Sequence, residues 1–144
     1  MQHKTIRFSK TNQAEFIADL RKQVKSYFET NNISTYGNWK MVLKTVFMFV
    51  LYFLPYILML TGVIANNWLV LAMWTLMGFG KSGIGLSVMH DANHGAYSRN
   101  KHVNKYMSYV MNLIGANSYI WKIQHNVLHH TFTNIDGMDE DIDP

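Results

Sequence analysis

A stretch of 36 residues without a single charge, Thr45–Gly80, constrains the fold of this chain more than any other feature. Because about 20 helical residues cross a hydrocarbon core of about 30 Å, the stretch is long enough for nearly two membrane spans. The pair Asn66-Asn67 lies in its middle, where a tight turn favours polar residues. The sequence therefore predicts an all-α, multi-pass membrane protein with a transmembrane hairpin of helices at about 45–65 and 68–89. A hairpin buried in a soluble protein is the alternative, but 144 residues leave little other chain to cover it.

Basic residues flank the predicted hairpin on both sides. Eight of the 13 Lys and Arg residues lie within residues 1–44, none lies in the turn, and four follow the second span. Since basic residues collect on the cytoplasmic side of a membrane, both flanks of the hairpin are expected in the cytoplasm. Membrane topology explains the net charge of +4, so no nucleic-acid partner is expected. The absence of cysteine excludes disulfides and thiolate metal sites.

Residues 1–40 are predicted to form a cytoplasmic N-terminal segment. This segment holds no short apolar core with a cleavage site, so a cleaved signal peptide is not expected. Asn12 and Glu15 fit a capping box, and apolar residues follow at a spacing of four. We therefore expect an amphipathic helix at about 12–29, which either lies on the membrane surface or packs on a cytoplasmic domain.

The second predicted helix is too long to end within the membrane. From Trp68 to His94 there are 27 residues, about 40 Å of helix, which exceeds the hydrocarbon thickness by about 10 Å. His90 and His94 are thus expected just beyond the lipid, on the cytoplasmic side. Tyr106–Trp121 is uncharged but short for a crossing, so it is predicted to lie at the interface and return the chain on the same side.

The glycine-rich sequence GFGKSGIG begins at Gly78 and contains G-x-G-x-x-G and Gly-Lys-Ser. A Walker loop needs a glycine at position 75, which is Thr, and the dinucleotide fingerprint needs a preceding strand in a βαβ unit. A nucleotide site is therefore not expected. The small residues instead predict close packing of membrane helices, with Lys81 reaching toward the headgroups. The glycines concerned are Gly78, Gly80, Gly83 and Gly85.

Five of the seven histidines fall into two clusters. The first holds His90 and His94, and the second holds His125, His129 and His130. Positions i and i+4 of a helix share a face, so each cluster can direct two imidazoles at one point. A further ligand at i+5 reaches a neighbouring point, which suits a pair of metal ions. Imidazole favours iron, zinc or copper, so the two clusters predict a transition-metal site.

Acidic residues concentrate at the end of the chain, where five of the nine occur after residue 134. Their spacing does not match a calcium-binding loop, so a solvated loop or helix start is expected. Some of these carboxylates, or Asp91, are candidates to accept a hydrogen bond from a ligand imidazole and fix its tautomer. The candidates of this kind are Asp91, Asp139 and Asp141.

The two clusters read HDANHGA and, about thirty residues later, HNVLHHTFTN. In this spacing after a two-span hairpin they resemble the first two histidine boxes of the membrane fatty acid desaturases, closest to the bacterial acyl-CoA and acyl-lipid group related to linoleoyl-CoA (front-end) desaturases. The resemblance implies that 41–144 is the first part of a desaturase domain in a bacterial inner membrane. It implies that the five clustered histidines are ligands of two non-haem iron ions. Such enzymes use dioxygen and two electrons to place a cis double bond in an acyl-CoA or acyl-lipid substrate.

The chemistry of the residues agrees with this resemblance. An unactivated methylene has no acidic proton and no leaving group, so a redox cofactor is needed. Tyr119, Ile120 and Trp121 precede the second cluster and are candidates to line an acyl channel, although packing against the interface explains them equally well.

The family pattern continues with two more spans and a third box, Q-x-x-H-H, which these 144 residues lack. The resemblance therefore implies an amino-terminal portion, inactive alone, that receives electrons from a separate ferredoxin or small haem protein. A related membrane hydroxylase acting on alkanes, carotenoids or sphingolipids is an alternative. A metal transporter or a non-catalytic metal-binding membrane protein is another, although a transporter expects ionisable residues within its spans.

Overall fold

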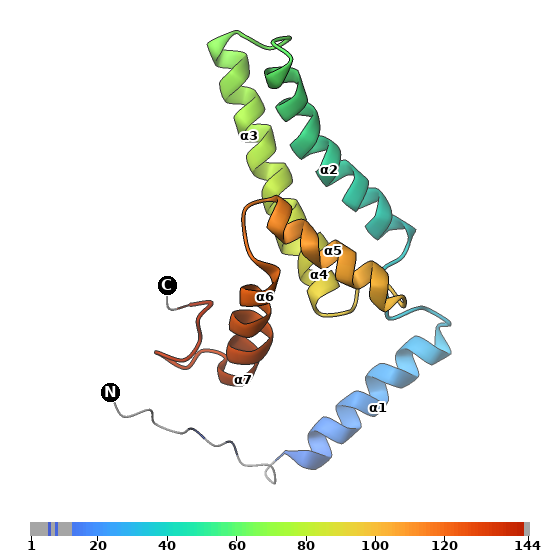
Figure 1. Ribbon diagram of the computed structural model, residues 1–144. Coiled ribbons are helices and arrows are strands. Elements are labelled where there is room, and N and C mark those ends of the chain that lie inside the picture. The colour runs from blue at the N-terminus through green and yellow to red at the C-terminus, as the bar shows by residue number, and fades with distance from the viewer. Residues whose placement is uncertain (1–5, 7, 9–12, 143–144) are drawn as a thin grey trace. The chain divides into compact units, whose positions relative to one another are not determined.

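The computed structural model describes residues 6, 8 and 13–142, and every regular element among them is a helix. The chain divides into two compact units, residues 1–35 and 36–144 (Figure 1). Two helices are long and apolar enough to cross a membrane. The predicted all-α membrane fold is therefore confirmed.

Helix α1 (Ala14–Thr30) belongs to the first unit. Its apolar residues lie on one face, yet none of its residues is buried, and Phe16, Leu20 and Val24 are all exposed. The helix agrees with the prediction for 12–29. Asn12 of the predicted capping box lies outside the described residues, and Gln13 occupies the N-cap without a side-chain hydrogen bond.

Helices α2 (Trp39–Leu60) and α3 (Asn67–Gly83) form the hairpin. Helix α2 begins before the predicted start near Thr45, because the Asn38 side chain caps it by accepting hydrogen bonds from two backbone N–H groups. It also ends earlier, at a turn in which Gly62 has φ of 74°. Asn66 caps α3 and does not form the turn with Asn67 that the sequence suggested.

Glycines bring the two helices of the hairpin close together. A Cβ on Gly80 would lie 2.8 Å from a backbone nitrogen of α2, and a Cβ on Gly83 would overlap the side chain of Met48. The prediction of close packing is confirmed at these two positions. It is wrong for Gly78 and Gly85, where an added Cβ would meet no atom within 4 Å.

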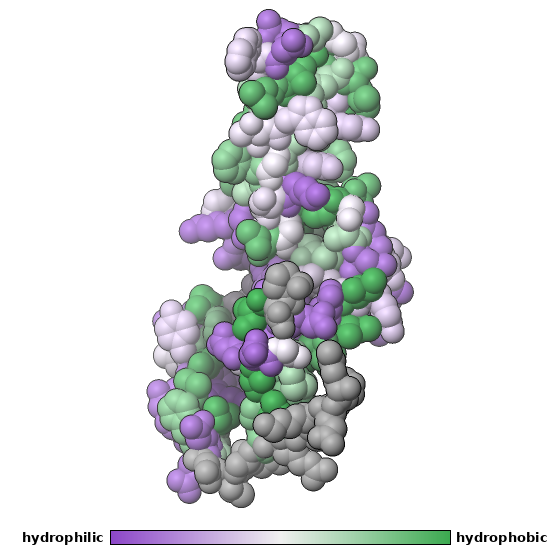
Figure 2. All heavy atoms as spheres, turned by 90° about the vertical axis from the view of Figure 1, so that its left-hand side faces the viewer, coloured by the Kyte–Doolittle hydropathy of each residue, from purple (hydrophilic) through white to green (hydrophobic). Residues whose placement is uncertain are grey.

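The hairpin carries its apolar side chains outward. Only 17% of the apolar window of each candidate span, Trp39–Leu60 and Asn67–Asn93, is buried within the protein. Hydrophobic residues accordingly spread over the surface of the upper part of Figure 2, with hydrophilic atoms at its tip. Lipid covers the apolar surface of a helical hairpin of this length, so the protein associates with a membrane.

The second span continues beyond α3 without interruption. It passes through the π-helix η1 (Ile84–Met89) into α4 (His90–Asn93), so that Asn67–Asn93 is one helix of 27 residues, as predicted. Helix α5 (Lys101–Leu113) packs against both η1 and α4. The small core lies at this contact, where Ile84 and Val88 are fully buried.

The prediction of one interface helix over Tyr106–Trp121 is wrong. Helix α5 ends at Leu113, and the chain breaks because Gly115 adopts φ of 92° and Asn117 caps a new helix. That helix begins as α6 (Ser118–Trp121), continues as the π-helix η2 (Lys122–His129) and ends as α7 (His130–Phe132), as Figure 1 shows below α5.

Candidate metal centre

The first histidine pair stands at the end of the long second helix. His90 begins α4, and His94 is its C-cap, after which Gly95 turns the chain with φ of 74°. The two imidazole rings are 4.5 Å apart between centroids. Because α4 is packed against α5, the position of this pair is fixed by the core.

The second cluster lies on a π-helix, which changes the direction of its side chains. The backbone N–H of His130 donates to the carbonyl of His125, five residues earlier. A π-turn is wider than an α-turn, so positions i+4 and i+5 both come to lie close to the face of position i. The rings of His129 and His130 are each 5.0 Å from that of His125. The sequence prediction assumed α-helical geometry and placed the ligand at i+5 at a neighbouring point.

The two clusters converge. His90, His94 and His125 each have a ligand nitrogen within 4.8 Å of those of the other two. The His125 ring centroid lies 5.1 Å from that of His90 and 5.2 Å from that of His94. His130 joins through His94, at 4.9 Å, and a second group with atoms within 4.8 Å consists of His125, His129 and Asp141. All five histidines singled out in the sequence thus form one cluster.

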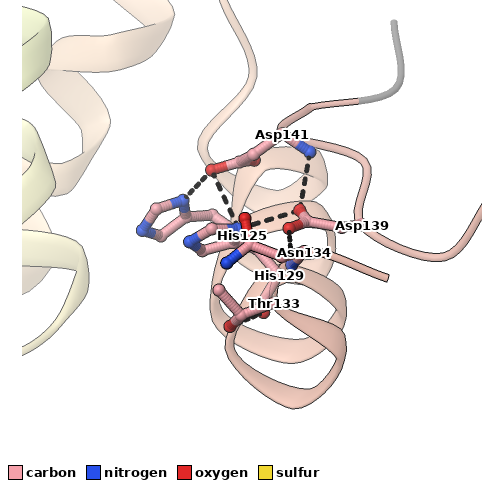
Figure 3. Close-up of polar contacts among 6 residues, drawn as sticks. All are labelled: His125, His129, Thr133, Asn134, Asp139 and Asp141. Atoms are coloured by element: carbon pink, nitrogen blue, oxygen red, sulfur yellow. Dashed lines mark hydrogen bonds and ion pairs between the residues drawn. The ribbon is translucent and has the colours of Figure 1, made fainter. Parts of the chain in front are cut away.

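Three of the rings contact a carboxylate through the same ring nitrogen, Nδ1, and Figure 3 shows two of these contacts. Nδ1 of His125 lies 2.5 Å from Asp141, Nδ1 of His129 lies 2.8 Å from Asp139, and Nδ1 of His90 lies 3.2 Å from Asp91. A carboxylate only accepts, so Nδ1–H is the donor in each pair. The neutral ring then keeps the lone pair of Nε2 for a metal ion. The three aspartates are those named from the sequence as partners of the histidines.

Asp139 is fully buried, so the expectation of a solvated acidic tail is wrong at this residue. Burial alone raises the pKa of its carboxyl. The hydrogen bonds from the Asn134 N–H, the His129 ring and the Asp141 N–H outweigh burial and hold this pKa below its ordinary value. Asp139 therefore stays ionised beside His129.

His94 has a lowered pKa. Burial disfavours its charged form, and the neighbouring rings of His90, His125 and His130 lower the pKa further, against a smaller opposite effect of Asp91. A neutral imidazole is the form that can bind a metal ion, and the lowered pKa keeps His94 in this form over a wider pH range.

An apolar groove of about 510 Å³ opens beside the cluster. His90, His125 and Trp121 line it, and Trp121 stacks on His125 with 4.3 Å between the ring centroids. Tyr119 and Ile120, also named as channel residues, are exposed, so their role stays a prediction. The sequence did not reveal the remaining apolar lining, because the contact between η1, α5 and the loop after α5 is not local: Gly85, Leu86, Met89, Met111, Ile114 and Ala116.

Lys81 also lies at this groove, where the sequence suggested only a headgroup contact.

The sequence model of the fatty acid desaturase family matches residues 66–144, which include both histidine clusters. The chain belongs to the fatty acid desaturase family. The chain is 39% identical over 127 residues to the sn-1 linoleoyl-lipid 6-desaturase of Arthrospira platensis, a match covering 88% of this chain and 34% of the relative. It is 35% identical to the acyl-lipid (8-3)-desaturase of Physcomitrium patens, over 96% of this chain and 28% of the relative.

A second linoleoyl-lipid 6-desaturase, from Synechocystis, is 32% identical over 92% of this chain and 36% of its own length. The chain thus spans about a third of the length of these relatives. No solved structure matches it significantly.

Proposed function

We propose that this desaturase forms part of a non-haem di-iron centre that introduces a cis double bond into the acyl chain of a membrane lipid. The observation that carries the proposal is the convergence of His90, His94 and His125 from two separate segments to within 4.8 Å. Family membership supports the reaction class.

The donor set fits iron. His90, His94, His125, His129 and His130 would hold it, and imidazole is a ligand that iron accepts. The hydrogen bonds from Nδ1 to carboxylates support this fit, because they orient the rings and leave Nε2 available. When bound, the iron pair supplies the oxygen-dependent redox chemistry that removal of two hydrogens from an unactivated methylene requires.

The residues around the cluster bind and position the substrate. The apolar groove fits a hydrocarbon chain, and because His90 and His125 line it, a methylene lying there is next to the rings. The stacked Trp121 closes one wall and keeps water from that side. The names of the relatives favour a lipid-linked acyl chain over acyl-CoA.

The cluster is proposed to lie at the cytoplasmic side of a bacterial inner membrane, because Lys and Arg flank the hairpin there. A separate ferredoxin or small haem protein would deliver the two electrons. Five imidazoles are too few to surround two ions, so we expect the 144 residues alone to bind metal without turnover.

The test is a measurement of iron content and products. The desaturase in its full natural length is expressed with a ferredoxin system, and bound iron is counted alongside the unsaturated acyl products. We expect about two iron ions per chain and oxygen-dependent unsaturation, both lost in His90→Ala and His125→Ala. Unchanged iron content in both variants would overturn the proposal. A hydroxylated product would show that the protein is the related hydroxylase and not a desaturase.

A further inference from the structure

The two histidine-bearing segments meet at a helix end. The long second helix stops at α4, and the backbone carbonyls of His90, Asp91 and Ala92 accept hydrogen bonds from the N–H groups that follow. The carbonyl of Asn93 takes no such bond in the described chain. It is instead reached by Nδ2 of Asn126, at 3.2 Å, from the second histidine segment.

This contact therefore satisfies a carbonyl that a helix C-terminus leaves without a partner inside the helix. Capping of this kind normally comes from residues near the helix end. Here the donor is 33 residues further along the chain.

The neighbours of the two asparagines make the contact informative. Asn93 immediately precedes His94, and Asn126 immediately follows His125. The bond thus links the side chain of the residue after His125 to the backbone of the residue before His94, and the centroids of these two rings are 5.2 Å apart.

The surroundings show that the pair is not there for simple packing. Asn93 is 8% exposed, and the carboxamide oxygens of both Asn93 and Asn126 are buried without a partner among the described residues. A buried oxygen without a hydrogen bond is unfavourable, and a leucine would fill such space at lower cost. Polar groups retained at such a cost are found at functional sites.

We propose that Asn126 is a positioning residue, which fixes the separation between the two histidine boxes by capping the helix that carries the first. The positioning role itself is inferred from the Asn126–Asn93 hydrogen bond. Its effect on metal binding rests on the proposed metal centre. Because the acceptor is a backbone carbonyl, the donor on Asn126 is the group that substitution can remove.

The variant Asn126→Asp tests the proposal by the sign of its effect. An ionised Asp has nearly the same shape but cannot donate, so the bond is lost and the carboxylate faces a carbonyl. It also adds a negative charge beside the site, which by itself strengthens binding of a cation. We expect affinity for Co²⁺, used alone as a spectroscopic probe, to fall by about tenfold or more despite that charge.

Val127→Asp is the matched control, because Val127 is an exposed neighbour on the same helix. It adds the same charge without touching the bond, and we expect its Co²⁺ affinity to equal or exceed that of the wild type. Equal or tighter Co²⁺ binding in Asn126→Asp would overturn the proposal.

A distance measurement separates this inference from the metal itself. The chain has no cysteine, so spin labels can be placed at single cysteines in Lys101→Cys and Ile123→Cys. Both positions are exposed, the first on α5, which packs against α4, and the second on η2. In the metal-free protein we expect a narrow distance distribution that broadens with Asn126→Asp and not with Val127→Asp. A distribution unaffected by Asn126→Asp would contradict the positioning role. Absence of Co²⁺ binding in the wild type would instead contradict the proposed metal centre, while the distance result would still decide the positioning role.

Discussion

The ring of His129 is held by the carboxylate of Asp139, which is fully buried and accepts two further hydrogen bonds from backbone N–H groups. The contact makes the acidic end of the described chain part of the histidine cluster. Removing the charge with Asp139→Asn should weaken the orientation of His129 and lower metal affinity by about 10-fold to 100-fold. Competition titration with Co²⁺ measures the change.

Asp136→Asn is the control for this prediction, since Asp136 is exposed and has no contact with a histidine in the described structure. If both variants bind Co²⁺ like the wild type, Asp139 does not orient a ligand.

Gly85 lines the groove, and a side chain there would meet no atom within 4 Å on its first carbon. Gly85→Phe should therefore fill the groove without disturbing the helices, and lower acyl-lipid binding and desaturation by about tenfold or more. Binding of a fluorescent acyl lipid and bound iron are the two measurements, and iron should not change. Gly78→Phe is the matched control, because it is equally open but lies away from the groove. Equal lipid binding by both variants would show that the groove does not bind the acyl chain.

The lowered pKa of His94 predicts a pH dependence of stability. In the unfolded chain His94 titrates near the ordinary value of 6.5, whereas the folded state resists protonation. The unfolded state thus binds more protons below pH 6.5, so the free energy of unfolding of the metal-free protein should fall as the pH drops from there toward the folded pKa. Unfolding measured between pH 7.5 and 5.5 checks this, and His94→Gln should show a smaller fall. A His94→Gln variant with the same pH dependence would show that the cluster does not lower this pKa.

The close contact at Gly80 predicts that the stability of the hairpin depends on this glycine. A methyl group there would press on the backbone of α2 at 2.8 Å, so Gly80→Ala should destabilise the protein by about 1–3 kcal/mol. Gly78→Ala, on the same helix with open space, should be neutral or stabilising by up to about 1 kcal/mol, because alanine favours helix more than glycine. Reversible unfolding in detergent compares the two. Equal stabilities would mean that α2 and α3 do not pack through Gly80.

Features with a regular period could be read from the sequence. The charge-free stretch predicted the hairpin, and the residue count from Trp68 predicted one long second helix with His90 and His94 at its end. Other features depend on contacts that no period encodes. The break at Gly115 depends on one residue with positive φ, and the burial of Asp139 depends on the chain folding back onto η2.

The apolar groove also depends on contacts between segments that are distant in the sequence. The sequence predicted that Gly85 packs between helices because it belongs to a glycine-rich segment, but in the structure it lines the groove beside residues of α5 and has open space around it.

The π-helix at Lys122–His129 brings three imidazoles of one short segment to the same side of the helix. A regular α-helix places the side chains at i+3 and i+4 beside position i, whereas the one at i+5 is rotated away, so His130 would be turned away from His125. Widening the turn recruits His130 without lengthening the protein. Deleting a single residue from this segment would tighten the turn and swing one donor away, although every histidine would still be present.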